Sequence, residues 1–264
     1  MKKLFAIFGD PVAHSRSPLM HNSVFKNLNY KACYTRIHLT DGSKLRERFF
    51  SLGLSGANIT VPHKEAAFKA CDEVRGFAKN IGVVNTIINE NGKLIGYNTD
   101  ADGFMEAVKE FGDVKTILIL GAGGTAKALA NRFIQENIEV TVLNRGKERL
   151  DYFKELHCTC YTWEEFKISK YDLVVNTTSA GLKDEEYPAP EHIIEEILNN
   201  TSFVADAIYG KVTPFLKLAC AKNITYKDGA DMLLNQGILA NELFVNYELK
   251  KDEIKLYMQR SFEL

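Results

Sequence analysis

Short runs of apolar residues alternate along the chain with segments whose apolar positions recur at helical spacing. The runs are rich in Ile, Val and Leu, and each is short enough to be a strand. They cover residues 4–8, 35–39, 57–61, 115–120, 138–143, 173–176 and 203–207. This alternation is typical of an α/β protein with parallel sheets, in which helices separate the strands.

One pair of runs breaks the parallel pattern. Residues 87–88 and 94–95 are apolar and flank Asn91-Gly92, two residues that tolerate the backbone of a tight type I′ turn. We therefore expect one antiparallel hairpin within an otherwise parallel arrangement.

The pattern divides near residue 103. The loop at 96–100 ends the first series of elements, and a helix over 101–111 leads into a new strand at Lys115. The last helical stretches, 230–247 and 251–260, fit either half by their pattern alone. We expect two domains, the first of them formed by residues 1–103.

Composition narrows the class of protein. The chain has 264 residues, 45% hydrophobic and 25% charged, which is ordinary for a globular protein of one large or two modest domains. Lys plus Arg is 33 against 34 for Asp plus Glu, without runs of like charge, so we expect no nucleic-acid partner.

The cysteines and the N-terminus bear on the compartment. Five scattered cysteines suit a reducing environment, and the run at 157–160 (His-Cys-Thr-Cys) lacks a second ligand pair, so we expect no metal site. The apolar run at 4–8 is too short for a signal peptide, and no stretch is long enough to span a bilayer. These features predict a cytoplasmic protein without a membrane partner.

A glycine-rich turn joins the run at 116–120 to a helix-forming segment, and it has the G-x-G-x-x-A pattern. In such a turn the first glycine permits the bend, the second lets the backbone approach a pyrophosphate, and the alanine allows close helix packing. The helix N-terminus then offers N–H groups to phosphates. A flexible loop can look the same, but the flanking strand and helix favour dinucleotide binding. The turn residues are Gly121, Ala122, Gly123, Gly124, Thr125 and Ala126.

The end of the next strand favours NADP over NAD. NAD enzymes usually place a carboxylate there, whereas this chain has Asn144 and Arg145. Arg145 and Arg149, one helical turn apart, can pair with a 2′-phosphate by charge-assisted hydrogen bonds. The alternative is that both arginines are solvated at the start of a helix.

Small polar residues gather at four places in the first half of the chain, where strands end. The segments are 14–18, 56–64, 82–86 and 98–100. Their hydroxyls and amides, with one ammonium and one carboxylate, suit a small polyhydroxylated acid as substrate.

Lys64 and Asp100 are the candidate acid–base pair among these polar residues. An ammonium near a reacting hydroxyl can exchange a proton with it, and a carboxylate can orient the ammonium. The alternative is a surface salt bridge. Asn58 and Asn85 have a structural alternative too, as turn residues bonded to their own backbone.

These segments form a series of motifs that continues through the chain. Residues 9–18 match G-x-P-x-x-H-S-x-S-P, 58–64 match N-[VI]-T-x-P-x-K, and Asn85-Thr86 and 98–100 complete the first half. In the second half the matching segments are 121–126, 144–145, 176–178, 213–216 and 229–236. Together they resemble the shikimate dehydrogenase family.

The resemblance implies the reversible NADPH-dependent reduction of 3-dehydroshikimate to shikimate. It implies an N-terminal α/β substrate domain of residues 1–103, with residues 236–264 packing back on it, and a Rossmann-type NADP-binding domain of residues 104–235. It leaves a homodimer open. A quinate/shikimate enzyme is the near alternative, and a nucleotide-binding sensor is an alternative of another class, against which the retention of Lys64 and Asp100 argues.

The resemblance also assigns roles to individual residues. It makes Lys64 and Asp100 the catalytic pair, gives Tyr209 a supporting contact near the substrate, and places Gly229 at the cofactor. Two departures stand out: the loop after Tyr209 is shortened, and Gly146 stands where the family often has Thr. The residues assigned to the substrate carboxylate and hydroxyls are Ser15, Ser17, Asn58, Thr60, Asn85 and Gln236.

Overall fold

The computed structural model describes residues 2–263, which divide into two compact units. Unit 1 holds the described residues up to Gly103 and those from Leu234 onward, and unit 2 is Phe104–Leu233. The chain leaves unit 1 within helix α5 (Asp100–Val108) and returns within α10 (Ala230–Phe244).

Unit 1 is built on a mixed sheet of six strands in the order β2-β1-β3-β5-β6-β4. Strand β1 pairs in parallel with β2 and β3, whereas β5 runs antiparallel to β3 and β6. Asn91 and Gly92 both have positive φ between β5 and β6, which confirms the predicted hairpin. The strands are β1 (Lys3–Gly9), β2 (Ala32–His38), β3 (Gly56–Ile59), β4 (Glu73–Val74), β5 (Thr86–Glu90) and β6 (Lys93–Tyr97).

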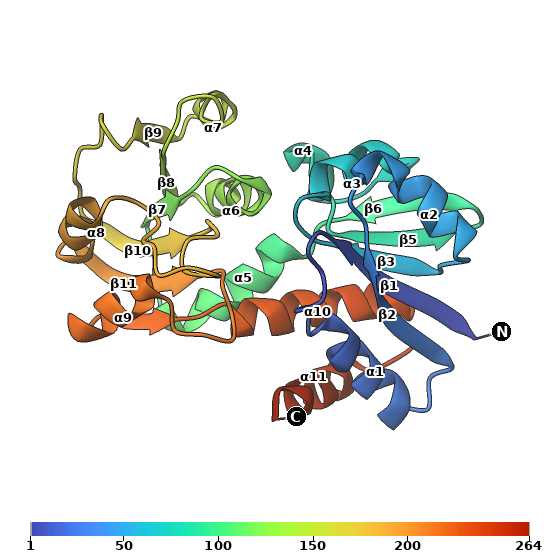
Figure 1. Cartoon of the computed structure of the whole chain (residues 1–264). Helices are drawn as coiled ribbons and strands as arrows, with labels where there is room; N and C mark the ends of the chain where they lie inside the picture. Colours follow the sequence, from blue (N-terminus) through green and yellow to red (C-terminus); the bar gives the residue numbers. More distant parts are fainter. Residues whose placement is uncertain (1, 264) are drawn as a thin grey trace. The chain divides into compact units, whose positions relative to one another are not determined.

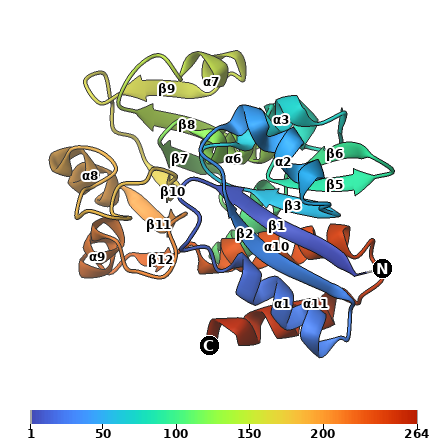
Figure 2. The same ribbon diagram turned by 45° about the vertical axis from the view of Figure 1, so that its right-hand side comes forward.

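Helices cover both faces of this sheet (Figures 1 and 2). Ala6 and Phe8 of β1 pack into one cluster with Phe49 of α2, while Phe5 points to the other face. There the Phe5 ring lies 4.6 Å from that of Phe244 in α10. The helices are α1 (Ser17–Asn27), α2 (Leu45–Ser51), α3 (Lys64–Ala70), α4 (Ala78–Ile81) and α11 (Lys251–Arg260), with 3-10 turns η1 (Gly42–Lys44) and η3 (Ser261–Glu263).

Unit 2 is a parallel sheet of six strands in the order β12-β11-β10-β7-β8-β9. Read from β9, this is the 3-2-1-4-5-6 order of the dinucleotide-binding fold, and the order reverses between β7 and β10. The predicted α/β class is confirmed. The strands are β7 (Thr116–Leu120), β8 (Glu139–Asn144), β9 (Thr159–Thr162), β10 (Tyr171–Asn176), β11 (Thr201–Asp206) and β12 (Thr225–Lys227).

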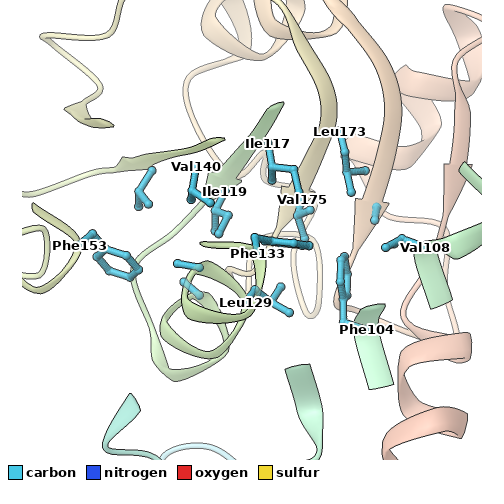
Figure 3. Close-up of a cluster of buried hydrophobic side chains, with 14 of the residues drawn as sticks. Phe104, Val108, Ile117, Ile119, Leu129, Phe133, Val140, Phe153, Leu173 and Val175 are labelled. Atoms are coloured by element: carbon cyan, nitrogen blue, oxygen red, sulfur yellow. The ribbon is translucent and has the colours of Figure 1, made fainter. Parts of the chain in front are cut away.

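Alternation along β7 explains why both faces of this sheet carry helices. Ile117 and Ile119 join Phe133 of α6 in the cluster shown in Figure 3, whereas Leu118 and Leu120 belong to the opposite cluster with α8 and α9. The helices are α6 (Gly124–Gln135), α7 (Asp151–Glu155), α8 (Glu191–Leu198) and α9 (Pro214–Ala221), with the 3-10 turn η2 (Lys109–Phe111).

Several element ends differ from the expected ones. Strand β3 stops at Ile59, short of the predicted end at Val61, which is 63% exposed although its carbonyl oxygen accepts from the Asp10 N–H at 3.1 Å. Helix α5 begins at Asp100 and tightens into η2 after Val108. Helix α10 ends at Phe244, since Asn246 and Tyr247 adopt left-handed backbone that a helix cannot contain.

Among the described residues, none of the helices is both long and apolar enough to cross a membrane. The five cysteines are free thiols. Residues 2–263 hold no group of three or more His, Cys, Asp or Glu side chains arranged to bind a metal.

Candidate active site

Lys64 and Asp100 meet in unit 1, each as the first residue of a helix. Lys64 follows the end of β3 and begins α3, and Asp100 follows the end of β6 and begins α5. Lys64 Nζ lies 2.6 Å from Asp100 Oδ2, with side chains only 13% and 9% exposed. This burial separates the pair from an ordinary surface salt bridge, which is solvated and weak.

The Asp100 carboxylate is held from both sides. Asn85 Nδ2 donates to Asp100 Oδ1 at 2.8 Å, while Lys64 occupies Oδ2. Asn98 Oδ1 accepts from the Asp100 N–H at 3.0 Å, and Asn85 Oδ1 accepts from the Thr99 N–H at 2.9 Å. The loop at 98–100 therefore presents the carboxylate in one orientation to the Lys64 ammonium.

The two serines of the first motif are buried, and they lie side by side at the start of α1. Ser15 Oγ donates to Ser17 Oγ at 3.2 Å and accepts from the Ser17 N–H at 3.3 Å. The Arg36 guanidinium donates to the Ser15 carbonyl oxygen from Nε at 2.9 Å and from Nη2 at 2.5 Å. Arg36, which sequence reasoning missed, thus anchors the backbone that carries both serines.

Asn58 lies inside the unit rather than on a turn. It is 5% exposed in β3, and its Oδ1 accepts from the Tyr34 hydroxyl at 2.6 Å. Its Nδ2 donates to Thr86 Oγ1 at 3.0 Å and to the Asn85 carbonyl oxygen at 3.3 Å. Both amide hydrogens are therefore engaged within the protein. Tyr34 and Thr86 were not identified from the sequence, although the Asn85-Thr86 motif contains the second of them.

Thr60 and Gln236 also lie in unit 1. Thr60 follows β3, and its methyl group lies where a side chain at Gly9 would begin, 2.4 Å from an added Cβ. Gly103, in the first turn of α5, allows that helix to approach Gln236 of α10, since an added Cβ would lie 2.6 Å from the Gln236 nitrogen. This close approach brings Gln236 next to the helix that begins at Asp100.

In unit 2, the glycine turn lies at the carboxyl end of β7, where the strand order reverses. Gly121 has φ +100°, and an added Cβ would lie 2.8 Å from Thr178 Cγ2, so this position requires glycine. Gly123 precedes α6, and an added Cβ there would meet nothing within 4 Å. Ala126 is fully buried against the sheet. The open space at Gly123 and the N–H groups of the first turn of α6 fit a pyrophosphate.

The residues after β8 differ from expectation in one respect. Arg145 and Arg149 do not lie on a helix, because residues 145–150 form bends and turns and α7 begins only at Asp151. Gly146 within this stretch disfavours a helix, and Asn144 Nδ2 donates to the Gly146 carbonyl oxygen at 2.8 Å. Both arginines are exposed, and the Glu148 carboxylate lies 2.4 Å from an added Cβ at Gly146.

Gly229 and Tyr209 both adjoin the short segment that follows β11 in unit 2. An added Cβ at Gly229 would lie 2.4 Å from the Ala207 carbonyl oxygen, so packing alone explains this glycine. Tyr209 is partly buried and follows β11, which ends at Asp206. Asp206 is 1% exposed, and burial raises the pKa of its carboxyl.

Asp206 secures the loop that carries Tyr209. It accepts hydrogen bonds from the Ile208 N–H at 2.9 Å, Asn176 Nδ2 at 3.1 Å and Thr213 Oγ1 at 2.8 Å. Sequence reasoning missed Asp206, although a carboxylate at the end of an otherwise apolar run was a visible signal.

Comparisons with known proteins match both units to the same family. Residues 7–87 match the family model of the shikimate dehydrogenase substrate binding domain, and residues 105–188 match that of shikimate / quinate 5-dehydrogenase. The shikimate dehydrogenase (NADP(+)) of Helicobacter hepaticus is 45% identical over 264 residues, covering 99% of this chain and 98% of the relative.

Solved structures of shikimate dehydrogenases are similar to this chain over nearly its whole length. The Thermus thermophilus shikimate 5-dehydrogenase, in complex with NADP(H) and shikimate, is 33% identical with a TM-score of 0.85, covering 98% of this chain and 99% of that one. The Listeria monocytogenes enzyme, in complex with shikimate and NAD, is 27% identical with a TM-score of 0.78, covering 97% and 96%. The predicted family is thereby confirmed, and the chain belongs to the shikimate dehydrogenase family.

Proposed function

We propose that this protein catalyses the reversible NADPH-dependent reduction of 3-dehydroshikimate to shikimate, a step in aromatic amino-acid biosynthesis. The observation that carries the proposal is the buried Lys64–Asp100 pair among the polar side chains of unit 1, in a chain of this family. The T. thermophilus relative, crystallised with NADP(H) and shikimate, supports both the substrate and the cofactor.

Lys64 and Asp100 perform the proton transfer. NADPH, when bound, supplies the hydride that the carbonyl carbon of the substrate receives. The Lys64 ammonium then donates a proton to the carbonyl oxygen, and in the reverse direction it takes the proton from the hydroxyl. Asp100, held by Asn85, keeps the ammonium at one position so that little reorganisation is needed during the reaction.

The other residues of unit 1 hold the substrate. The hydroxyls of Ser15 and Ser17 bind its carboxylate, while Thr60 and Gln236 bind its hydroxyl groups. Asn85, which the resemblance also assigns to these hydroxyl groups, has its amide hydrogens on Thr99 Oγ1 and Asp100 Oδ1 in this structure. Asn58 supports the site from the interior of unit 1, since both of its amide hydrogens are already donated to other groups of the protein. Tyr209 belongs to unit 2, on a loop held by Asp206, and its supporting contact with the substrate rests on the resemblance to the family.

Unit 2 holds the cofactor. The turn from Gly121 to Ala126 receives the pyrophosphate, and Asn144, Arg145 and Arg149 receive the adenosine ribose with its 2′-phosphate. Gly229, which packs on the Ala207 backbone in the same unit, is assigned to the cofactor by the resemblance to the family.

A cytoplasmic location stays a prediction, and a homodimer stays an open alternative. The absence of a nucleic-acid partner, which rests on the balanced charge of the chain, also stays a prediction. A broader specificity that includes quinate is the second candidate, because the matching family model covers shikimate and quinate enzymes.

The purified protein is expected to reduce NADP when shikimate is added, as measured by the absorbance of the reduced nicotinamide. A parallel reaction with quinate tests the broader specificity. Detectable NADP binding without turnover of either compound would contradict the proposal and favour a nucleotide-binding sensor.

Lys64→Ala is expected to lower kcat by about 10²–10⁴-fold and to change KM much less, because proton transfer is realised mainly in the transition state. Asp100→Asn should have a similar but smaller effect. Lys69→Ala, which removes an exposed lysine of the same helix, is the matched control. If Lys64→Ala changes KM alone, Lys64 binds substrate and does not transfer the proton.

Gly123→Ala is expected to weaken NADP binding about tenfold or more. Its added methyl group would occupy the space through which the pyrophosphate approaches the backbone, and losing one charge-assisted N–H contact has that effect. The fold should persist, because the backbone at Gly123 (φ −86°, ψ −171°) suits any residue and the added methyl meets no neighbour. Gly121→Ala, strained at φ +100°, should instead lower Tm. Fluorescence titration gives the Kd, and an unchanged Kd for Gly123→Ala would place the pyrophosphate elsewhere.

Arg145→Ala is expected to weaken NADP tens-fold and NAD hardly at all, because a charge-assisted contact is worth roughly 1.5–3 kcal/mol. Gly146 stands where the family often has a threonine, whose hydroxyl is absent here, so the preference of the unmodified protein for NADP over NAD is expected to be modest. Lys147→Ala is the control from the same loop, since Lys147 pairs with Glu165 at 2.7 Å. The measurement is the ratio of kcat/KM for NADP and NAD. A ratio near one in the unmodified protein, or one unaffected by Arg145→Ala, would show that the arginines are simply solvated.

A further inference from the structure

A row of buried polar side chains crosses the interior of unit 1 on one face of its sheet. Tyr34 comes from β2, Asn58 from β3 and Thr86 from β5, with exposed fractions of 4%, 5% and 0%. Asn58 and Thr86 are directly paired in register on neighbouring strands. Burying polar groups costs free energy, so apolar side chains would be expected in this space. The presence of polar side chains there suggests that their hydrogen bonds have a function.

The hydrogen bonds of this row all point the same way. The Tyr34 hydroxyl donates to Asn58 Oδ1 at 2.6 Å, and Asn58 Nδ2 donates to Thr86 Oγ1 at 3.0 Å. Thr86 Oγ1 then donates to Asn85 Oδ1 at 3.0 Å, and Asn85 Nδ2 donates to Asp100 Oδ1 at 2.8 Å. The row therefore ends on the carboxylate that holds Lys64.

Neighbouring groups that can only donate or only accept fix this direction. The Asn85 carbonyl oxygen only accepts, so Asn58 must turn its Nδ2 toward it. The Thr99 N–H only donates, so Asn85 must turn its Oδ1 toward that group. The Thr86 hydroxyl, which accepts from Asn58, has its single hydrogen left for Asn85. Neither the Asn58 nor the Asn85 amide can be rotated by 180° without placing donor against donor or acceptor against acceptor.

The buried serine pair lies near the other end of the row. Burial raises the pKa of Tyr34, and the neighbouring Ser17 side chain opposes that rise. The row from Tyr34 to the Lys64–Asp100 pair lies entirely within unit 1.

His21 supports the row from α1. Its ring stacks on that of Tyr34, with centroids 4.4 Å apart and planes 10° apart. Burial lowers the pKa of His21 to about 3, so its ring is neutral, and Nδ1 lies 2.8 Å from Asn241 Nδ2 of α10. Nδ1 therefore accepts from Asn241, which places the ring N–H of the neutral His21 on Nε2.

We propose that Tyr34, Asn58 and Thr86 are positioning residues that orient Asn85, and through it Asp100 and Lys64, for proton transfer. The proposal rests on the acid–base role of Lys64 under the proposed function. It makes Asn58 a link in the interior rather than a direct contact of the substrate. Bonds in such a row polarise one another, so breaking any one of them weakens the last.

The test compares Thr86→Val, which keeps the shape but removes the hydroxyl, with Thr86→Ser, which keeps the hydroxyl. Thr86→Val is expected to lower kcat about tenfold or more, because it leaves an Asn58 hydrogen and Asn85 Oδ1 short of a partner. Thr86→Ser should restore most of that loss, and KM for NADP should stay within about twofold, since the row does not reach the glycine turn.

Tyr34→Phe removes only the first donor and keeps the ring stacked on His21, so kcat should fall roughly 2–10-fold. The double variant Tyr34→Phe/Thr86→Val should be no slower than Thr86→Val within about twofold, because both changes break one row. Tyr30→Phe is the matched control, since its hydroxyl bonds Lys3 Nζ outside the row. Tm is measured for every variant, and if Thr86→Val does not fold, Tyr34→Phe against Tyr30→Phe decides.

Three results in a folded, active protein overturn the positioning role: an unchanged kcat in Thr86→Val, a Thr86→Ser variant as slow as Thr86→Val, or multiplying effects in the double variant. An inactive unmodified protein would contradict the proposed function and the positioning role with it. An active unmodified protein with a normal Thr86→Val variant would contradict the positioning role alone.

Discussion

A cation and a carboxylate withdrawn from water are tolerated only as a pair, because each alone would carry a large desolvation cost. Lys64 and Asp100 form such a pair at 2.6 Å, and a network of buried amides and hydroxyls in unit 1 holds it. Asn85 donates to the second oxygen of the Asp100 carboxylate. Backbone N–H groups of the 98–100 loop donate to the side chains of Asn85 and Asn98. Asn58 and Thr86 are hydrogen-bonded to each other deeper in the unit. The side chains of Lys64 and Asp100 are only 13% and 9% exposed, and the low polarity of a protein interior strengthens each of these bonds.

In both units the candidate functional residues lie where a strand is followed by a helix. In unit 1 a strand ends and a helix begins at Lys64 and again at Asp100, and in unit 2 the same change occurs at the glycine turn after β7. Side chains and N–H groups at such junctions are free of the sheet ladder, and the helix N-terminus favours negative charge. The Asp100 carboxylate gains from this at α5, and a pyrophosphate would gain from it at α6.

The fold was largely readable from the sequence because its signals are local. Apolar runs in unit 2 predicted strands close to those observed, and Asn91-Gly92 identified the hairpin through its turn chemistry alone. Expectations went wrong where local pattern competes with backbone constraints. The apolar Val61 extended a predicted strand past β3, and the arginine spacing after β8 suggested a helical turn that Gly146 disfavours.

By itself the sequence determined the α/β class, the family and the residues of the motifs, because alternation, turn chemistry and the spacing within a motif are properties of neighbouring residues. Only the tertiary structure decided which side chains meet. Tyr34, Asn58 and Thr86 are far apart along the chain and become one row because β2, β3 and β5 lie in one sheet. Burial likewise decided that Asn58 is engaged on both sides and that Asp206 is a buried carboxylate, since hydrogen-bond partners and solvent exposure depend on contacts that no local pattern contains.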